Sequence, residues 1–175
     1  MAQRSVVTYG NPFLKRRASE ITEIDDSVKK LAEEMFETLD RSRGVGLAAP
    51  QVGVPLRLIV LSIPSDDGTR WKCAIVNPEL VSKNGRITSE EGCLSVPGVY
   101  EDITRAEEVE VKGLDLEGKE MRVKGKGLLA KAVQHEIDHI NGILIVDRLS
   151  AIKRHVLQKR LRKLEESSKG SRAQR

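Results

Sequence analysis

Residues 128–142, LLAKAVQHEIDHING, combine an apolar helical pattern with an unusual group of polar side chains. The apolar residues recur at helical spacing and form one broad face, which consists of Leu129, Ala132, Val133, Ile137 and Ile140. Gly142 follows as a C-terminal stop. The pattern predicts a helix that ends near Ile140 and whose apolar face must be covered by other elements.

The rest of the chain predicts strands and two further helices. Strand-like runs, either apolar and β-branched or alternating with period two, are residues 56–63, 71–78, 108–113 and 119–125. Helical patterns cover 25–39 and 150–165, whereas residues 167–175 have a composition typical of disorder. Strands and helices do not alternate in βαβ fashion. The sequence therefore predicts an α+β fold, with mostly antiparallel β-sheets packed around a central helix that carries HExxH, plus a C-terminal helix.

The composition is that of a globular chain. Of 175 residues, 39% are hydrophobic and 32% are charged, and no run approaches the roughly 18 apolar residues of a membrane span. The N-terminus lacks the apolar core of a signal peptide. We therefore expect a cytoplasmic protein without membrane association, in which Cys73 and Cys93 are reduced thiols.

Two of the chain's three histidines, His135 and His139, lie four positions apart. On a helix such residues differ by about 40° in direction, so both rings can bind one cation. Glu136 lies near the same face and can reach a water molecule on the metal, which is the usual chemistry of HExxH. The alternative is a charged helical turn without a metal. Because burying unpartnered polar groups costs several kcal/mol, the apolar surroundings favour the metal site.

A hydrolytic metal site usually has three protein ligands, so a third must lie elsewhere. The metzincin pattern would place it at a position that Ile145 occupies, and an aliphatic side chain cannot coordinate. The gluzincin pattern would use Glu165 or Glu166, although a surface ion pair explains these two residues more simply.

Cys93 is the remaining candidate ligand. It lies in EGCLSVPG, residues 91–98, where Gly and Pro predict an irregular or edge segment. A thiolate there would complete a Cys-His-His site with a fourth position open for water, and zinc or ferrous iron would suit it. Cys73 lies within a predicted strand and is expected to be structural.

The segment GVGLAAPQVG, residues 44–53, contains GxGxxA, which could indicate a dinucleotide site. That motif requires a strand before it and a helix after it. Here a predicted helix precedes it, and Pro50 would break a following helix. A tight loop entering a strand is the better interpretation, because small residues let the backbone approach a ligand. Gln51 could then offer an amide N–H to an oxyanion.

Together, GVGLAAPQVG (44–53), EGCLSVPG (91–98) and QHEIDHINGIL (134–144) resemble the peptide deformylase family in order and spacing. The resemblance implies a single metallohydrolase domain, residues 1–150, followed by a basic C-terminal helix and tail, residues 151–175. It implies a metal-dependent enzyme that removes the formyl group from N-formylmethionine of nascent polypeptides and releases formate. Fe²⁺ is the expected cofactor, and Ni²⁺, Co²⁺ or Zn²⁺ could replace it.

The resemblance also implies roles for single residues around the metal. Cys93, His135 and His139 match the metal ligands, and Glu136 matches the general acid/base. Asp138 could orient the site from behind a ligand or lie on the surface.

Other matched residues concern the substrate. The Gln51 side chain and the Leu94 backbone N–H match the donors to the formyl oxygen, and Gly46 matches a loop glycine that lines the substrate groove. Val45 and Leu128 are our candidates for the wall of an apolar methionine pocket.

The C-terminal residues 151–175 contain nine Lys or Arg and two Glu, a net charge of +7 that leaves −3 for the rest of the chain. In some family members a basic C-terminal helix contacts the ribosome, so this segment is either a ribosome-binding element or a solvated helix face. Two other functions remain open: a gluzincin-like endopeptidase, and a ribosome- or RNA-binding module whose metal is structural.

Overall fold

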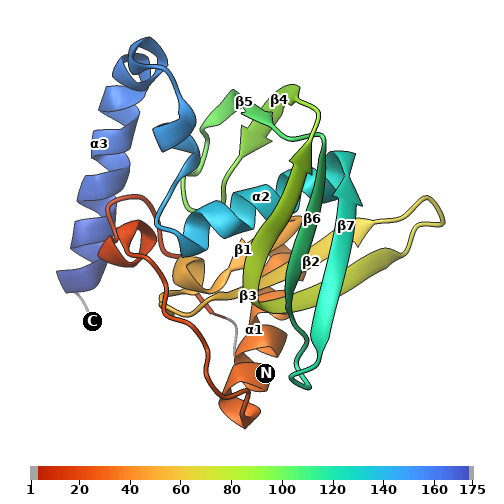
Figure 1. The fold of residues 1–175 in the computed structure, drawn as a ribbon. Coiled ribbons are helices and arrows are strands. Elements are labelled where there is room, and N and C mark those ends of the chain that lie inside the picture. The colour runs from red at the N-terminus through yellow and green to blue at the C-terminus, as the bar shows by residue number, and fades with distance from the viewer. Residues whose placement is uncertain (1–3, 174–175) are drawn as a thin grey trace.

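The computed structural model describes residues 4–173, in which two antiparallel sheets are combined with three α-helices (Figure 1). The larger sheet has the strand order β1-β2-β3-β6-β7, with bounds Gly46–Ala48, Leu58–Pro64, Arg70–Asn84, Glu108–Leu114 and Glu120–Lys126. The smaller sheet pairs β4 (Ile87–Gly92) with β5 (Tyr100–Arg105). All neighbouring strands in the two sheets pair antiparallel. The predicted α+β fold is confirmed.

Strand β2 is buried on both faces, which explains its continuous apolar run. Ile59 and Leu61 belong to a core cluster with α2 (Gly127–Ile140), whereas Leu58 and Val60 belong to a second cluster with α1 (Asp26–Ser42). Successive side chains of a strand point to opposite faces of its sheet. The larger sheet therefore lies between α1 and α2.

Helix α2 is the central helix of the prediction. Its apolar residues pack against the inner face of the larger sheet, and they are Ala130, Ala132, Val133, Ile137 and Ile140. After Ile140 the chain turns through Gly142, whose φ is 75°. A Cβ on Gly142 would lie 2.7 Å from the Lys15 carbonyl oxygen, so the turn requires glycine for both backbone and space.

Strand β3 is longer than the predicted run 71–78. The predicted run ends at Pro78, and a proline has no N–H to donate to the ladder. In the structure the pairing with β6 shifts between Val76 and Glu79, and Asn77 has a φ of 50°. This bulge takes Pro78 out of the regular ladder, and the strand continues to Asn84.

Three short strands lie outside the predicted runs, because their sequences lack a clear apolar alternation. Strand β1 lies within the loop 44–53 and pairs with β2. Strand β4 ends at Gly92, directly before Cys93. Cys93 therefore follows the end of a strand in a two-stranded sheet, in agreement with the expected edge position.

A third core cluster joins the N-terminal segment to α3 (Ala151–Ala173), and it includes Leu14, Val99 and Leu161. Helix α3 continues to Ala173, so the prediction of disorder is wrong for residues 167–173. The packing of Ser168, which is buried and donates to the Thr8 carbonyl oxygen at 3.5 Å, depends on a distant segment and has no sequence signal. Residues 174–175 lie outside the described part of the chain.

No helix within residues 4–173 combines the length and apolar character that crossing a lipid bilayer requires.

Candidate metal centre and catalytic groove

Three ligand atoms from two distant segments meet at one point. Cys93 follows β4, whereas His135 and His139 lie one turn apart on α2. The His139 Nε2 atom lies 3.2 Å from Cys93 Sγ and 3.2 Å from His135 Nε2. All three ligand atoms fall within 4.8 Å of one another. Nitrogen ligands about 2.0–2.1 Å from a tetrahedral ion are roughly 3.3 Å apart, so these residues fit a divalent metal.

The downstream glutamates do not join this group. Glu165 forms an ion pair with Lys169 at 2.9 Å, one turn further along α3. Within residues 4–173, Cys93, His135 and His139 are the one set of three such side chains whose ligand atoms converge. The gluzincin arrangement is therefore not formed.

His135 is oriented by a carboxylate behind it. Its Nδ1 atom lies 3.1 Å from Glu91 Oε2, and Glu91 also accepts two hydrogen bonds from Arg105, at 2.9 and 3.0 Å. Burial alone would raise the pKa of Glu91. The hydrogen bonds from His135 and Arg105 outweigh burial and bring that pKa down to about 2. An ionised Glu91 holds the proton of His135 on Nδ1 and leaves the Nε2 lone pair for a metal.

Asp138 is buried and continues this network. It accepts a hydrogen bond from Arg105 Nη1 at 2.5 Å and is gripped by both Nε and Nη2 of Arg148, each at 2.5 Å. Asp138 is therefore not a surface group. It connects to His135 through Arg105 and Glu91.

His139 is the most deeply enclosed of the three ligands. Burial lowers its pKa well below the usual value, and the charges of His135 and Arg105 lower it further. The ring is therefore neutral and has a lone pair to offer. Its Nδ1 atom is buried and has no hydrogen-bond partner among the described residues.

Glu136 lies beside the ligand His135 and is buried, although it borders the groove described below. Burial raises its pKa to about 7, although the charges of His135 and Arg105 oppose that rise. Its Oε2 atom has no hydrogen-bond partner within residues 4–173. A Cβ on Gly46 would lie 2.5 Å from Glu136 Oε1, so only glycine at this position of β1 permits the observed approach. A carboxyl group that titrates near neutral pH is suited to both accept and donate a proton.

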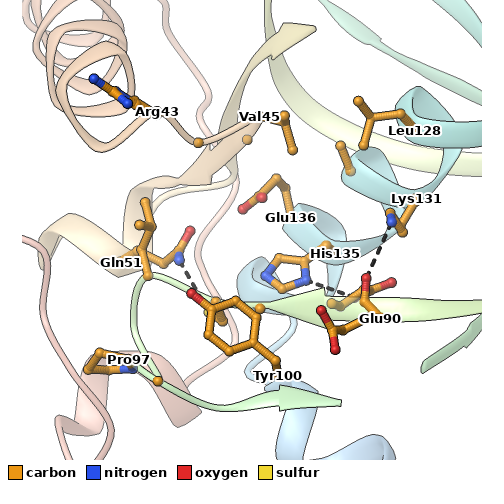
Figure 2. A pocket seen from close by; sticks show the side chains of 18 residues that line it. Arg43, Val45, Gln51, Glu90, Pro97, Tyr100, Leu128, Lys131, His135 and Glu136 are labelled. Atoms are coloured by element: carbon orange, nitrogen blue, oxygen red, sulfur yellow. Dashed lines mark hydrogen bonds and ion pairs between the residues drawn. The ribbon is translucent and has the colours of Figure 1, made fainter. Parts of the chain in front are cut away.

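Gln51 points its amide nitrogen at the same centre (Figure 2). Its Oε1 atom accepts a hydrogen bond from the Ala48 N–H at 2.8 Å, which fixes the orientation of the amide. Its Nε2 atom then donates to Ser95 Oγ at 3.3 Å and to Cys93 Sγ at 3.7 Å. The 3₁₀ turn Ala49–Val52 thus presents a buried donor next to the ligand cluster.

These groups open into a groove of about 480 Å³. Val45 and Leu128 lie on its wall, and Figure 2 shows both beside Glu136. Leu94 and Gly46 also line the groove. Within the described part of the chain, the Leu94 N–H makes no hydrogen bond, so it is available as a donor.

The nine residues predicted as metal ligands, catalytic groups or groove-lining residues all lie in this groove or in the ligand cluster. The sequence analysis missed Glu91, Tyr100 and Lys131, which also line the groove. Glu91 could have been found, because it stands two residues before Cys93 in the same motif. Lys131 and Tyr100 belong to no sequence motif that would have identified them. The Lys131 side chain donates to Ser89 Oγ and to the Glu90 carbonyl oxygen, at 3.3 and 3.4 Å.

Comparisons with known proteins identify the relatives of this chain. The family model described as Polypeptide deformylase matches residues 3–155. A peptide deformylase from Thermomicrobium roseum is 48% identical over 153 residues, which cover 85% of this chain and 87% of that protein. A crystal structure of a peptide deformylase from Legionella pneumophila superposes with a TM-score of 0.84 at 44% identity and covers 99% of both chains. A peptide deformylase from Ehrlichia chaffeensis in complex with actinonin has a TM-score of 0.87 at 38% identity and covers 93% of this chain and 98% of its own.

Proposed function

The chain belongs to the polypeptide deformylase family, and from that premise we propose how its own residues carry out the reaction. The protein is a hydrolase that removes the formyl group from the N-terminal methionine of nascent polypeptides, and metal dependence is general to the family. The proposal concerns the role of each residue, the identity of the metal and the partner of the C-terminal helix.

Cys93, His135 and His139 are the metal ligands in this proposal. Their three ligand atoms converge within 4.8 Å, and one thiolate with two imidazoles suits Fe²⁺ or Zn²⁺. We take Fe²⁺ as the native ion, with Ni²⁺, Co²⁺ or Zn²⁺ as substitutes. When bound, such an ion would acidify a water molecule and so supply the nucleophile near neutral pH.

Glu136 acts as the general acid/base. Its carboxyl group, with a pKa of about 7 in the metal-free protein, accepts the proton of the attacking water and later delivers it to the leaving amine. The buried Oε2 atom without a protein partner supports this role.

Gln51 Nε2 and the Leu94 N–H stabilise the negative charge that develops on the formyl oxygen. The anchor from the Ala48 N–H to Gln51 Oε1 holds the donor in place before the substrate arrives. A preorganised donor of this kind typically contributes about 3–4 kcal/mol to the barrier.

The methionine side chain of the substrate packs against Val45 and Leu128. Gly46 lines the same groove and gives the substrate backbone room to approach β1. Leu128 is 38% exposed, which is high for a large apolar residue and leaves apolar area for a ligand to cover.

One observation carries the proposal: the three ligand atoms converge within 4.8 Å, and two of the ligands, Cys93 and His135, line one groove with Glu136 and Gln51. The test is formate release from formyl-Met-Ala-Ser by protein purified and loaded with metal under anaerobic conditions, with elemental analysis of the same sample. Cys93→Ala should lose both metal and activity, and Glu136→Ala should keep the metal and lose most turnover. A metal-loaded protein that releases no formate would leave a structural metal in a binding module as the better explanation.

We propose that the basic C-terminal helix, within residues 151–175, contacts the ribosome, and that residues 1–150 are the catalytic domain. Lys159, Arg162 and Lys163 are exposed and have no carboxylate partner in the part of the chain described by the structure. Ile152 and Val156 are 79% and 75% exposed one turn apart on the same helix, as expected of a docking surface. Such a role would place the protein in the cytoplasm, with the nascent chains that it processes.

The ribosome contact is tested by reversing charge rather than deleting α3, because Leu161 belongs to the third core cluster. The triple variant Lys159→Glu, Arg162→Glu and Lys163→Glu should no longer co-sediment with ribosomes at physiological salt. A control triple variant replaces three exposed lysines elsewhere, Lys30, Lys119 and Lys124, with glutamate. It makes the same change in charge and should still co-sediment with ribosomes. Equal losses in both triple variants would reduce the contact to nonspecific charge attraction.

A further inference from the structure

A chain of ion pairs runs from Arg148, outside the groove, to the metal ligand His135. Arg148 grips both oxygens of Asp138 at 2.5 Å, and Asp138 accepts Arg105 Nη1 at 2.5 Å. Arg105 then holds both oxygens of Glu91 at 2.9 and 3.0 Å, and Glu91 Oε2 lies 3.1 Å from His135 Nδ1. Each link is within hydrogen-bond distance, so the chain is unbroken.

This series of ion pairs connects two separate cavities. His135 and Glu91 line the catalytic groove, whereas Arg105, Asp138 and Arg148 line a second cavity of about 330 Å³. The two cavities share no lining residue. Arg148 therefore cannot act on the substrate directly from its observed position.

Two guanidinium groups, those of Arg105 and Arg148, face the two buried carboxylates, Glu91 and Asp138. The side chains of Arg105, Glu91 and Asp138 are 2%, 4% and 10% exposed, and that of Arg148 is 37% exposed. Without Arg148, one guanidinium would serve two buried carboxylates. Arg105 uses Nη1 for Asp138 and the pair Nε and Nη2 for Glu91. An unbalanced Asp138 would draw Arg105 toward itself and loosen the two-point grip on Glu91.

We propose that Arg148 is a positioning residue: by neutralising Asp138 it keeps Arg105 on Glu91, and so holds His135 in the orientation that binds the metal. The inference rests on His135 being a metal ligand, as proposed above. Groups that orient a ligating histidine through its second nitrogen typically change metal affinity by about 10- to 100-fold. Arg148 acts three ion pairs beyond Glu91, so we expect an effect near the lower end of that range, about tenfold.

The test measures metal affinity, independently of turnover. Apoprotein is titrated with Co²⁺ against a competing chelator under anaerobic conditions, and the visible spectrum of the Co²⁺ protein is recorded. Arg148→Met should weaken the affinity by about tenfold and shift the spectrum. Arg148→Lys restores the charge but cannot grip both oxygens of Asp138, so it should recover only part of the affinity.

Lys15→Met is the matched control. Lys15 pairs with Asp147 at 2.6 Å, next to Arg148 in the 3₁₀ turn Ile145–Arg148, and this pair has no link to Glu91. Its loss should leave Co²⁺ affinity and spectrum unchanged. An equal weakening in Lys15→Met and Arg148→Met would mean that Arg148 merely stabilises the turn, and the proposal would fall.

A double-mutant cycle with Glu91→Gln identifies the route. If Arg148 acts through Glu91, then Arg148→Met should reduce Co²⁺ affinity much less in the Glu91→Gln background than in the wild type. Additive losses would overturn the proposed chain. Formate release by the Co²⁺-saturated wild type is measured in parallel, so failure of the proposed catalytic site is distinguishable from failure of the Arg148 inference.

Discussion

Gly46 on β1 and Glu136 on α2 are in such close approach that a Cβ on Gly46 would lie 2.5 Å from Glu136 Oε1. The family resemblance implies that Gly46 lines the substrate groove, and the structure gives this glycine a second constraint. It leaves the space that the carboxyl group of Glu136, the proposed general acid/base, occupies. The absence of a side chain at Gly46 thereby fixes where that carboxyl group lies.

Gly46→Ala should therefore impair catalysis while the metal stays bound. The added methyl group must displace the Glu136 carboxyl, and a displacement of about 1 Å can cost on the order of 100-fold in rate. Turnover of formyl-Met-Ala-Ser and metal content are the two measurements. Gly170→Ala, where the new methyl group meets no other part of the described chain, serves as the control and should behave as wild type. Full activity in Gly46→Ala would show that the loop yields without cost.

Glu136 should make the metal-free protein less stable as the pH rises through neutrality. Its pKa is about 7 in the fold against a usual 4.5, so between these values the folded state binds more protons than the unfolded state. Linkage then requires stability to fall with rising pH over that window. Over the whole window, the free energy of unfolding should fall by roughly 3 kcal/mol.

Glu136→Gln removes this dependence, because a neutral amide does not titrate. Denaturant midpoints of both metal-free proteins between pH 5 and about 8 give the comparison. The denaturant midpoint of Glu136→Gln should rise steadily relative to that of the wild type as the pH rises. Parallel curves would mean that Glu136 titrates at its ordinary pKa.

Gln51→Ala should lower kcat by about 100- to 1,000-fold with little change in KM, because the lost donor acts on charge that exists only in the transition state. Steady-state kinetics with a saturating range of peptide separates the two constants. Ser95→Ala is a useful comparison, since it removes a partner of Gln51 Nε2 but leaves the Ala48 anchor. An increase in KM alone after Gln51→Ala would assign Gln51 to substrate binding instead.

Metal uptake should release protons. Burial opposes protonation of His135, but its hydrogen bonds with Cys93 and Glu91 and the nearby charge of Glu136 prevail and raise the His135 pKa well above its usual value. Metal binding must displace that proton, so affinity should rise with pH. Calorimetric titrations of the apoprotein in two buffers of different ionisation enthalpy count the protons released. Heats that do not depend on the buffer would contradict a protonated His135.

Much of the fold and the candidate site could be predicted from the sequence because the relevant patterns are local. The apolar face of α2 repeats within a few turns, and His135 and His139 face the same way by helix geometry alone. Cys93 could be named from the sequence as the remaining candidate ligand, and the family resemblance then matched it to the metal site. The thiol stands about forty residues upstream, and only the fold brings it close. The limits appear where long-range contacts decide the outcome.

Arg105 illustrates such a limit. In the sequence it is one arginine among many charged residues, and its buried position between Glu91 and Asp138 depends on the pairing of β4 with β5 and on α2 packing beside them. Strand β3 illustrates another: the sequence contains Pro78, but whether a proline ends a strand or sits in a bulge depends on the neighbouring strand.

Strand β2, whose alternate residues belong to two core clusters, has a consequence for how the molecule opens. Neither helix layer can separate from the sheet without exposing one face of the same strand. The amides of Ile59 and Val60 should therefore exchange with solvent deuterium only through global unfolding. An inhibitor bound on the α2 side would then slow exchange at the core of α1 by the same factor, because both layers share a single cooperative unit.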